Sequence, residues 1–95
     1  MKVKVKFFTL FRLEFGISEI VLNLKQDTIF LKDLLKIIDK ETGKKVSEKL
    51  LYSEDKIKNS AIILVNGKNI FHLNGLETFI QDGDEISLFP PGGGG

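Results

Sequence analysis

The segment KVKVKFFTLFR, residues 2–12, carries the clearest strand pattern in the sequence. Its residues alternate between two faces, as the side chains of a β-strand do. The face that we expect in the core carries Val3, Val5, Phe7, Thr9 and Phe11. The opposite face begins with lysines and ends with hydrophobic residues. The pattern therefore predicts a first strand that is buried on one side only.

A second strand is expected close behind the first. Gly16 marks a turn, and a strand pattern resumes over about residues 18–24. Two strands joined over so short a distance favour an antiparallel hairpin.

The hydrophobic period then changes from that of a strand to that of a helix. Within residues 27–45, one stripe of an amphipathic helix is formed by Leu31, Leu34, Leu35 and Ile38. Asp27 or Thr28 is expected to cap the first turn, and Gly43 is placed to end the helix.

The rest of the chain returns to strands and turns. Residues 44–60 are polar and rich in lysine, and their apolar residues 50–52 predict a loop or short helical turn packed on the core. AIILVNGKNI, residues 61–70, predicts a strand, a turn at Asn66-Gly67 and a short return strand. Residues 72–85 are expected to form a loop from which Leu76 and Ile80 reach the core. The last strand is EISLF, residues 85–89.

This order of elements predicts an α+β protein with the β-grasp fold. One main helix packs on one face of a mixed sheet, and the first and last strands lie side by side and parallel. That pairing would bring Phe8 and Phe89 together on the face away from the helix. We expect one domain over residues 1–91 and a flexible C-terminal glycine tail over residues 92–95.

Composition limits the classes of function. The 95 residues include no cysteine, which excludes disulfides, thiolate zinc sites and iron–sulfur clusters. Fourteen basic residues against 13 acidic ones give a net charge of +1, whereas a nucleic-acid-binding protein usually shows a clear basic excess. Signal-peptide and membrane-span patterns are lacking. We expect a soluble cytoplasmic protein that binds neither nucleic acid nor membrane.

Residues for conventional catalysis are scarce. His72 is the sole histidine and has no cysteine to partner it, so we interpret it as a surface loop residue. Asp82, Asp84 and Glu85 lack the spacing of a calcium loop and are better explained by a turn before a strand. We therefore expect no metal and no bound cofactor.

Eight phenylalanines are many for a chain of this length. Phe7 and Phe11 belong to the core by alternation, and Phe15 and Phe79 are further core candidates. Phe8 and Phe89 fall on the polar side of their strands. They are either scattered surface hydrophobes, which are common, or the start of a patch that binds a partner. The predicted parallel pairing favours the patch.

The C-terminus PPGGGG, residues 90–95, is the strongest anomaly. One reading is a disordered terminus or linker. The other begins with Pro90 and Pro91, which hold the chain extended as it leaves the last strand. Four glycines then make the thinnest backbone available. A thin thread that ends in the Gly95 carboxylate suits insertion into a narrow active site, where a partner would activate that carboxylate, for example by adenylation.

These segments also carry a family resemblance. VKFF at residues 5–8, VNG at 65–67 and DGDEISLFPPGGGG at 82–95 resemble the small subunit of molybdopterin synthase and its ubiquitin-like relatives. The segment VNGKNIFHLNGLET, residues 65–78, is most similar to the archaeal-type branch, which includes sulfur carriers and small protein modifiers.

The resemblance implies a ubiquitin-like β-grasp fold and a sulfur carrier. An E1-like adenylating enzyme would activate Gly95, which follows Gly94, and sulfur transfer would give a thiocarboxylate. The molybdopterin synthase large subunit would then receive the carrier, making this chain a cosubstrate more than an enzyme. The resemblance maps partner binding onto Phe8, Phe89 and the exit residues Pro90, Pro91, Gly92 and Gly93. The polar segment 44–60 and the glycines at 92 and 93 depart from the family pattern.

Other functions stay open from the sequence. Gly95 could instead form isopeptide bonds with lysines of other proteins, or the carrier could deliver sulfur to tRNA or a thiazole. A structural adaptor is a further reading, but it leaves the glycines unexplained.

Overall fold

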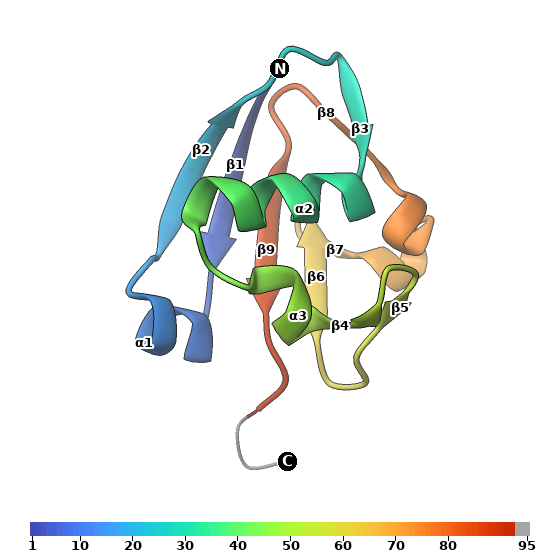
Figure 1. The fold of residues 1–95 in the computed structure, drawn as a ribbon. Helices are drawn as coiled ribbons and strands as arrows, with labels where there is room; N and C mark the ends of the chain where they lie inside the picture. The colour runs from blue at the N-terminus through green and yellow to red at the C-terminus, as the bar shows by residue number, and fades with distance from the viewer. Residues whose placement is uncertain (93–95) are drawn as a thin grey trace.

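A computed structural model describes residues 1–92 of the chain (Figure 1). Its strands are β1 (Lys2–Phe7), β2 (Glu19–Asn23), β3 (Thr28–Phe30), β4 (Leu51–Ser53), β5 (Lys56–Ile57), β6 (Ile62–Val65), β7 (Lys68–Asn69), β8 (Phe79–Gln81) and β9 (Glu85–Phe89). Its helices are α1 (Leu10–Phe15), α2 (Leu31–Thr42) and α3 (Val46–Leu50), with 3₁₀ turns η1 (Ile70–His72) and η2 (Gly75–Glu77).

The main sheet holds five strands in the order β2-β1-β9-β6-β7 (Figure 1). The first and last strands of the chain, β1 and β9, run parallel at its centre, with Val5 opposite Ile86. β2 pairs antiparallel with β1, and β6 pairs antiparallel with β9. The predicted parallel pairing of the terminal strands is confirmed.

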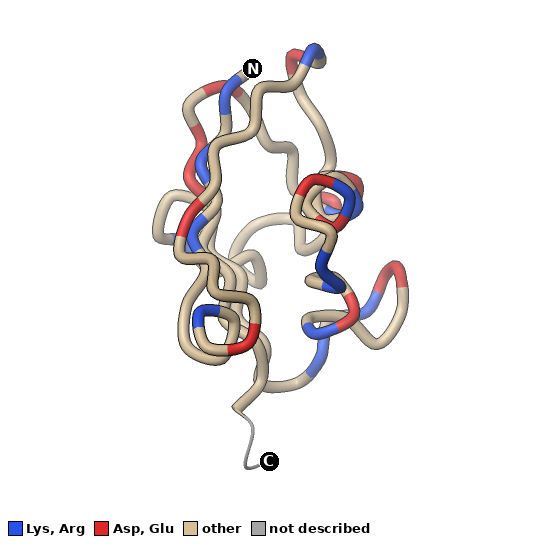
Figure 2. Tube along the Cα trace, turned by 60° about the vertical axis from the view of Figure 1, so that its left-hand side comes forward, with Lys and Arg blue, Asp and Glu red and all other residues tan. Residues whose placement is uncertain are grey.

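Helix α2 covers one face of this sheet, so that sheet and helix form two layers (Figures 1 and 2). The four residues of its predicted apolar stripe are fully buried: Leu31, Leu34, Leu35 and Ile38. They share one core cluster with the inward residues of β1 and β9, such as Val5 and Ile86. The predicted α+β, β-grasp architecture is therefore confirmed.

The first strand is shorter than its alternation predicted. β1 ends at Phe7, Thr9 adopts a φ of 52°, and the chain turns into helix α1. The helix ends at Gly16, whose φ of 67° is left-handed. The prediction of Thr9 on the core face is wrong, because the chain has left the sheet by then and Thr9 is exposed. Phe11 is buried as predicted, but from a helix, with its ring edge-on to Phe7.

Helix α2 ends where the sequence predicts, but its first turn is not capped by the predicted residues. Thr28 lies in β3, opposite Gln81 on β8, and Phe30 occupies the N-cap position without a side-chain hydrogen bond. The predicted capping by Asp27 or Thr28 is therefore wrong. At the other end, Gly43 has a φ of 69° and donates its N–H to the Asp39 carbonyl at 2.9 Å, as a C-terminal cap does.

Residues 72–85 are more ordered than the predicted loop. They contain η2 and β8, and β8 pairs with β3 in a small separate sheet. Leu76 and Ile80 are buried as predicted. Phe79, a core candidate, is 59% exposed because its side chain points away from Ile80 along the strand.

The polar segment 44–60 packs on the core through α3. Val46 and Leu50 of this short helix are buried, so a helical turn does pack on the core. Of the predicted residues 50–52 only Leu50 is buried, because Leu51 and Tyr52 belong to strand β4 and Tyr52 is exposed. The Ser47 N–H donates to Asp39 Oδ1 at 2.8 Å and so fastens α3 to α2. The small strand pair β4–β5 that follows has no clear signal in the sequence.

Basic and acidic residues are spread along the trace among longer uncharged stretches (Figure 2). Residues 1–92 include no helix that is long and apolar enough to cross a membrane.

Candidate functional site

The last strand, β9, lies in the middle of the main sheet, and the C-terminal segment follows it directly. Ile86 and Leu88 of β9 are fully buried. Leu88 lies opposite Phe7 of β1 on one side and Ile63 of β6 on the other. A strand that is paired along both edges cannot shift without breaking both ladders. The point from which the C-terminus leaves the fold is therefore fixed.

The exit from β9 follows Phe89 directly. Pro90 is buried, Pro91 is half-buried and Gly92 is exposed. Neither proline can donate a backbone N–H, so the sheet ladder ends here. Three of the predicted site residues, Gly93, Gly94 and Gly95, lie outside the described residues.

Phe8 and Phe89 meet on the sheet face opposite α2. Their ring centroids are 4.5 Å apart and the ring planes differ by 9°. The contact follows from the parallel register, because Phe7 lies opposite Leu88 and the Phe8 N–H donates to the Leu88 carbonyl at 3.1 Å. The structure thus brings together the two aromatic residues that the sequence placed on the outer face.

Arg12 joins this pair from helix α1. Its Nε donates to the Phe7 carbonyl at 2.7 Å, and its guanidinium carbon lies 4.9 Å from the centre of the Phe8 ring. A guanidinium over an aromatic face is an attractive arrangement. Sequence reasoning missed Arg12, because the alternation places residue 12 at the end of a strand instead of on a helix that folds back.

Ile62 is the second residue that sequence reasoning missed. It is the antiparallel partner of Phe89 and is 41% exposed. Its parity was a usable signal, since Ile63 and Val65 point into the core and Ile62 must then point outward. We call Phe8, Phe89, Ile62 and Arg12 the aromatic patch.

An ion pair lies next to the aromatic patch on the same face. Lys6 Nζ and Glu85 Oε1 are 2.6 Å apart and both side chains are partly exposed. The hydrogen bond to Lys6 lowers the pKa of Glu85, and the same bond raises the pKa of Lys6. The pair therefore keeps both charges over a wider pH range than isolated side chains would.

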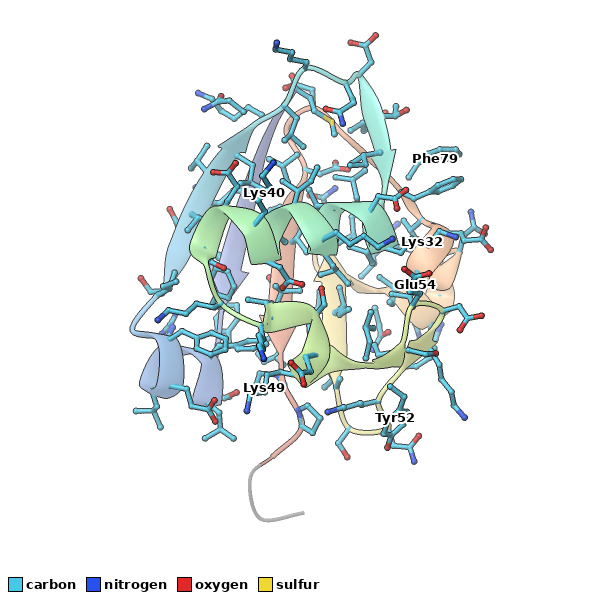
Figure 3. The ribbon with its side chains drawn as sticks, viewed as in Figure 1. Lys32, Lys40, Lys49, Tyr52, Glu54 and Phe79 are labelled. Carbon is cyan, nitrogen blue, oxygen red and sulfur yellow. The ribbon has the colours of Figure 1, made fainter. Side chains whose placement is uncertain are left out.

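A groove runs along the other side of the exit. It has a volume of about 180 Å³ and is lined by Leu10, Phe11, Glu14, Lys49, Lys58, Pro90 and Pro91. Lys49 of α3 bridges to Glu14 of α1 at 3.3 Å across this groove, on the side of the molecule where β9 ends (Figure 3). Sequence reasoning could not find the groove, because it depends on α1.

The polar residues of the last turn have structural partners. Asp82 Oδ1 accepts the Lys2 N–H at 2.7 Å, while Asp84 accepts Asn66 Nδ2 and the Gln81 N–H at 2.9 Å each. These bonds shape the turn before β9 and the adjoining turn between β6 and β7. His72 is exposed in η1. Residues 1–92 contain no group of three or more candidate metal ligands.

Known proteins resemble this chain over most or all of its length. A family model described as the ThiS family matches residues 5–95. The "Small archaeal modifier protein 3" of Haloferax volcanii is 30% identical over 95 residues, 100% of both chains. The "Putative sulfur carrier protein" of Archaeoglobus fulgidus is 32% identical over 84 residues, 88% of this chain and 94% of its own.

A solved structure from Pyrococcus furiosus is similar in both fold and sequence. It is named "Putative molybdopterin converting factor, subunit 1" and superposes with a TM-score of 0.70 at 32% identity. The superposition covers 97% of this chain and 99% of that one. The similarity therefore extends over the whole domain and is not confined to a motif.

Proposed function

This chain belongs to the ThiS family of ubiquitin-like sulfur carriers and modifiers, and on that basis we propose that it carries sulfur as a thiocarboxylate on Gly95. In this proposal an E1-like enzyme activates the Gly95 carboxylate with ATP. The sulfur acceptor is the precursor of molybdopterin, bound to the large subunit of a molybdopterin synthase. The chain itself acts as the sulfur donor and not as the catalyst.

The observation that carries the proposal is the way the fold presents its C-terminus. β9 is paired on both edges, and the chain leaves it through buried Pro90 and half-buried Pro91. The sequence then consists of glycine up to Gly95. A fixed root and a thread without side chains suit a narrow active site, where a side chain at this position would collide with the walls.

The low reactivity of the Gly95 carboxylate explains why the chain needs an activating enzyme as a partner. A carboxylate is a poor electrophile, so one of its oxygens first attacks the α-phosphate of ATP and releases pyrophosphate. Sulfide (HS⁻) then attacks the acyl carbon of the adenylate, a C–S bond forms, the bond from carbon to the AMP oxygen breaks, and the thiocarboxylate and AMP are the products. Glycine leaves both sides of this carbonyl open to attack. The thiocarboxylate sulfur becomes the nucleophile of the next reaction.

The aromatic patch is the proposed docking surface for these partners. It lies beside the exit of the C-terminus, and it combines two stacked phenylalanines, a half-exposed isoleucine and an arginine. Aromatic and arginine side chains are frequent among residues that dominate protein interfaces. A partner that binds the patch would hold the domain while its active site receives Gly92 to Gly95.

Molybdopterin synthesis is proposed as the pathway for one specific reason. The Pyrococcus furiosus protein, 32% identical over nearly the whole chain, carries the name "Putative molybdopterin converting factor, subunit 1". The direct test is sulfur transfer in a reconstituted reaction. The thiocarboxylated chain, mixed with a molybdopterin synthase large subunit and precursor, should yield molybdopterin. A chain that is charged with sulfur but transfers it only to tRNA would replace this pathway with tRNA thiolation.

Activation itself is tested by removing Gly95. The truncated chain should lose ATP–pyrophosphate exchange with the E1-like enzyme, while its melting temperature stays that of the full chain. The substitution Phe71→Ala provides a control, because Phe71 is exposed in η1 outside the aromatic patch. Unchanged exchange by the truncated chain would rule out Gly95 as the activated residue.

The second candidate function is conjugation of Gly95 to lysines of other proteins. It is favoured by the 30% identity to small archaeal modifier protein 3 over the full length of both chains. Mass spectrometry of cell extracts separates the two functions. Remnants of the C-terminal glycines on lysines of other proteins would indicate a modifier. A free chain in which sulfur has replaced one terminal oxygen would indicate a carrier.

A further inference from the structure

Strand β2 leaves one edge of the main sheet open. It is the first strand in the sheet order and lies at the left margin of the sheet in Figure 1. The hydrogen bonds to β1 run from the Phe7 N–H to the Ser18 carbonyl at 2.9 Å and from the Leu24 N–H to the Met1 carbonyl at 2.8 Å. The backbone N–H and C=O groups of the even-numbered residues 18–24 therefore point toward β1. The backbone groups of Glu19, Val21 and Asn23 point toward the open edge.

This edge lacks most of the features that protect natural sheet edges. Proteins commonly shield an edge with a very short strand, a lysine, a proline or a bulge. The opposite edge strand, β7, has two residues and one of them is Lys68. β2 has five residues, EIVLN, and its ladder with β1 is regular. Its one charge, Glu19, stands at the start of the strand.

The side chains along the edge are largely apolar. Val21 is 47% exposed on the outer face of the sheet. On the helix-facing side, Ile20 and Leu24 pack against the core but are only half-buried. A further strand paired at this edge would cover the side chains of Ile20, Val21 and Leu24.

We propose that β2 pairs antiparallel with β2 of a second copy of this chain, about a two-fold axis at Leu22. In this register Leu22 lies opposite Leu22 of the second copy, and Ile20 lies opposite Leu24, all on the helix-facing side. On the outer face Glu19 lies opposite Lys25 of the second copy, and symmetry creates this pair twice. The outward backbone groups of Val21 and Asn23 then meet as a hydrogen-bonded pair.

Other symmetric registers satisfy the sequence less well. An axis at Val21 sets polar Ser18 opposite Leu24 of the second copy. An axis at Asn23 sets Glu19 opposite Asp27, which places like charges together. Opposite charges directly across a strand pair stabilise it and like charges destabilise it. The opposite charges of Glu19 and Lys25, together with the apolar match of Ile20 and Leu24, therefore favour a second copy as the occupant and this register.

The dimer leaves the aromatic patch accessible. Phe8 follows the end of β1 that lies beside Ser18, whereas the two-fold axis passes through Leu22. Because an antiparallel pair extends one sheet, the outer faces of both copies point the same way. The dimer would present two aromatic patches on one continuous sheet surface.

Pairing of one short strand buries less surface than a standard protein interface of about 1,600 Å². We therefore expect a weak dimer that forms in the full-length protein only at concentrations on the order of 0.1–1 mM. Sedimentation equilibrium over this range measures the dissociation constant directly.

The test uses charge reversal at the two ends of the strand pair. Glu19→Lys and Lys25→Glu each place like charges opposite each other twice, and each should weaken the dimer roughly tenfold. The double variant restores opposite charges and should dimerise like the wild type. Equal parts of the two single variants should form a mixed dimer, because both lysines of the Glu19→Lys chain then face glutamates of the Lys25→Glu chain.

Matched controls are Glu41→Lys and Lys44→Glu, which reverse exposed charges at the end of α2 and should leave the dimer unchanged. A wild type that remains monomeric at about 1 mM would overturn the proposal. So would single variants that dimerise like the wild type, or a double variant that does not recover. If β2 pairs only with a strand of another protein, the second copy is not its partner and the proposal is also overturned.

Discussion

The ring of Phe8 stacks on the ring of Phe89 with 4.5 Å between their centroids, although the two residues lie near opposite ends of the chain. Phe8 follows the first strand and Phe89 ends the last one. Their contact ties the outer sheet surface to the exit of the C-terminus. In the proposed function, a partner that binds this pair would also receive the glycines that follow it in the sequence.

The aromatic patch should govern docking and leave the fold largely intact. Phe89→Ala removes one ring of the stack, and the loss of a central aromatic residue in an interface commonly costs more than about 1 kcal/mol. We expect an increase of about tenfold in the KM of the E1-like enzyme for this chain, with little change in kcat. Phe71→Ala is the matched control. An equal KM for the Phe89 variant and the control would remove the aromatic patch from the docking surface.

Ile62 offers an independent probe of the same surface. Ile62→Asp puts a carboxylate beside Phe89, where docking would bury it without a partner. Activation should fall by at least about tenfold at subsaturating concentrations of the chain. Val21→Asp introduces the same charge on the outer face at β2, away from the patch, and is expected to be activated normally. Equal defects in both variants would indicate a general effect of charge on this face.

The core stripe of α2 should determine global stability. Leu35 is fully buried, and Leu35→Ala leaves a cavity that costs about 2–5 kcal/mol of unfolding free energy. Urea denaturation followed by circular dichroism measures the loss. The exposed Leu13, which is 81% accessible, is the matched control, and Leu13→Ala should change stability by less than about 0.5 kcal/mol. Similar losses for both variants would contradict the assignment of Leu35 to the core.

Gly43, at the end of α2, has a left-handed backbone conformation. Substitution by alanine should therefore affect stability at Gly43 but not at Gly92. Gly43 has a φ of 69°, so Gly43→Ala forces an alanine into a conformation that costs about 1–2 kcal/mol. Gly92 has open space around it, and Gly92→Ala should leave the melting temperature unchanged. Thermal melts of the two variants measure the difference. Equal melting temperatures would show that residue 43 does not need the left-handed conformation.

The Lys6–Glu85 pair predicts a defined pH window. Its hydrogen bond lowers the pKa of Glu85 from 4.5, so this contribution is present above pH 4.5 and is lost as the pH falls through the lowered pKa. The same bond raises the pKa of Lys6 from 10.5, so that contribution is present below pH 10.5 and is lost as the pH rises through the raised pKa. The stability difference between the wild type and Glu85→Gln should be constant between these limits and disappear beyond them. Urea titrations across pH measure it. A difference that varies between about pH 5 and pH 10 would contradict the pair as its source.

Much of the fold is predictable because local patterns and global packing agree. The alternation of Val3, Val5 and Phe7 predicts a strand that is buried on one face, and the structure confirms it. The stripe of α2 and its end at Gly43 follow from helical spacing and from the backbone freedom of glycine. The order of the elements predicts the parallel pairing of the terminal strands.

Two of the failed predictions have identifiable physical causes. The alternation in residues 2–12 continues to Phe11, yet the chain leaves the sheet at Phe8 and forms α1, because a short apolar run suits a strand and a helix equally well. Phe79 looked like a core residue, but pairing of β8 with β3 turns Ile80 inward and Phe79 outward. The orientation of Phe79 is thus decided by a strand pairing between distant parts of the chain.

Some features of the candidate site follow from local sequence, and others depend on the tertiary structure. Local sequence was enough to show that the last strand runs into two prolines and four glycines, where the ladder must stop because proline has no N–H to donate. Parity alone also placed Phe8 and Phe89 outward. Folding in three dimensions was needed to bring Arg12 and Ile62 to the same surface and to leave the edge of β2 open. Those features depend on strand register and on helix α1, which are set by contacts between residues far apart in sequence.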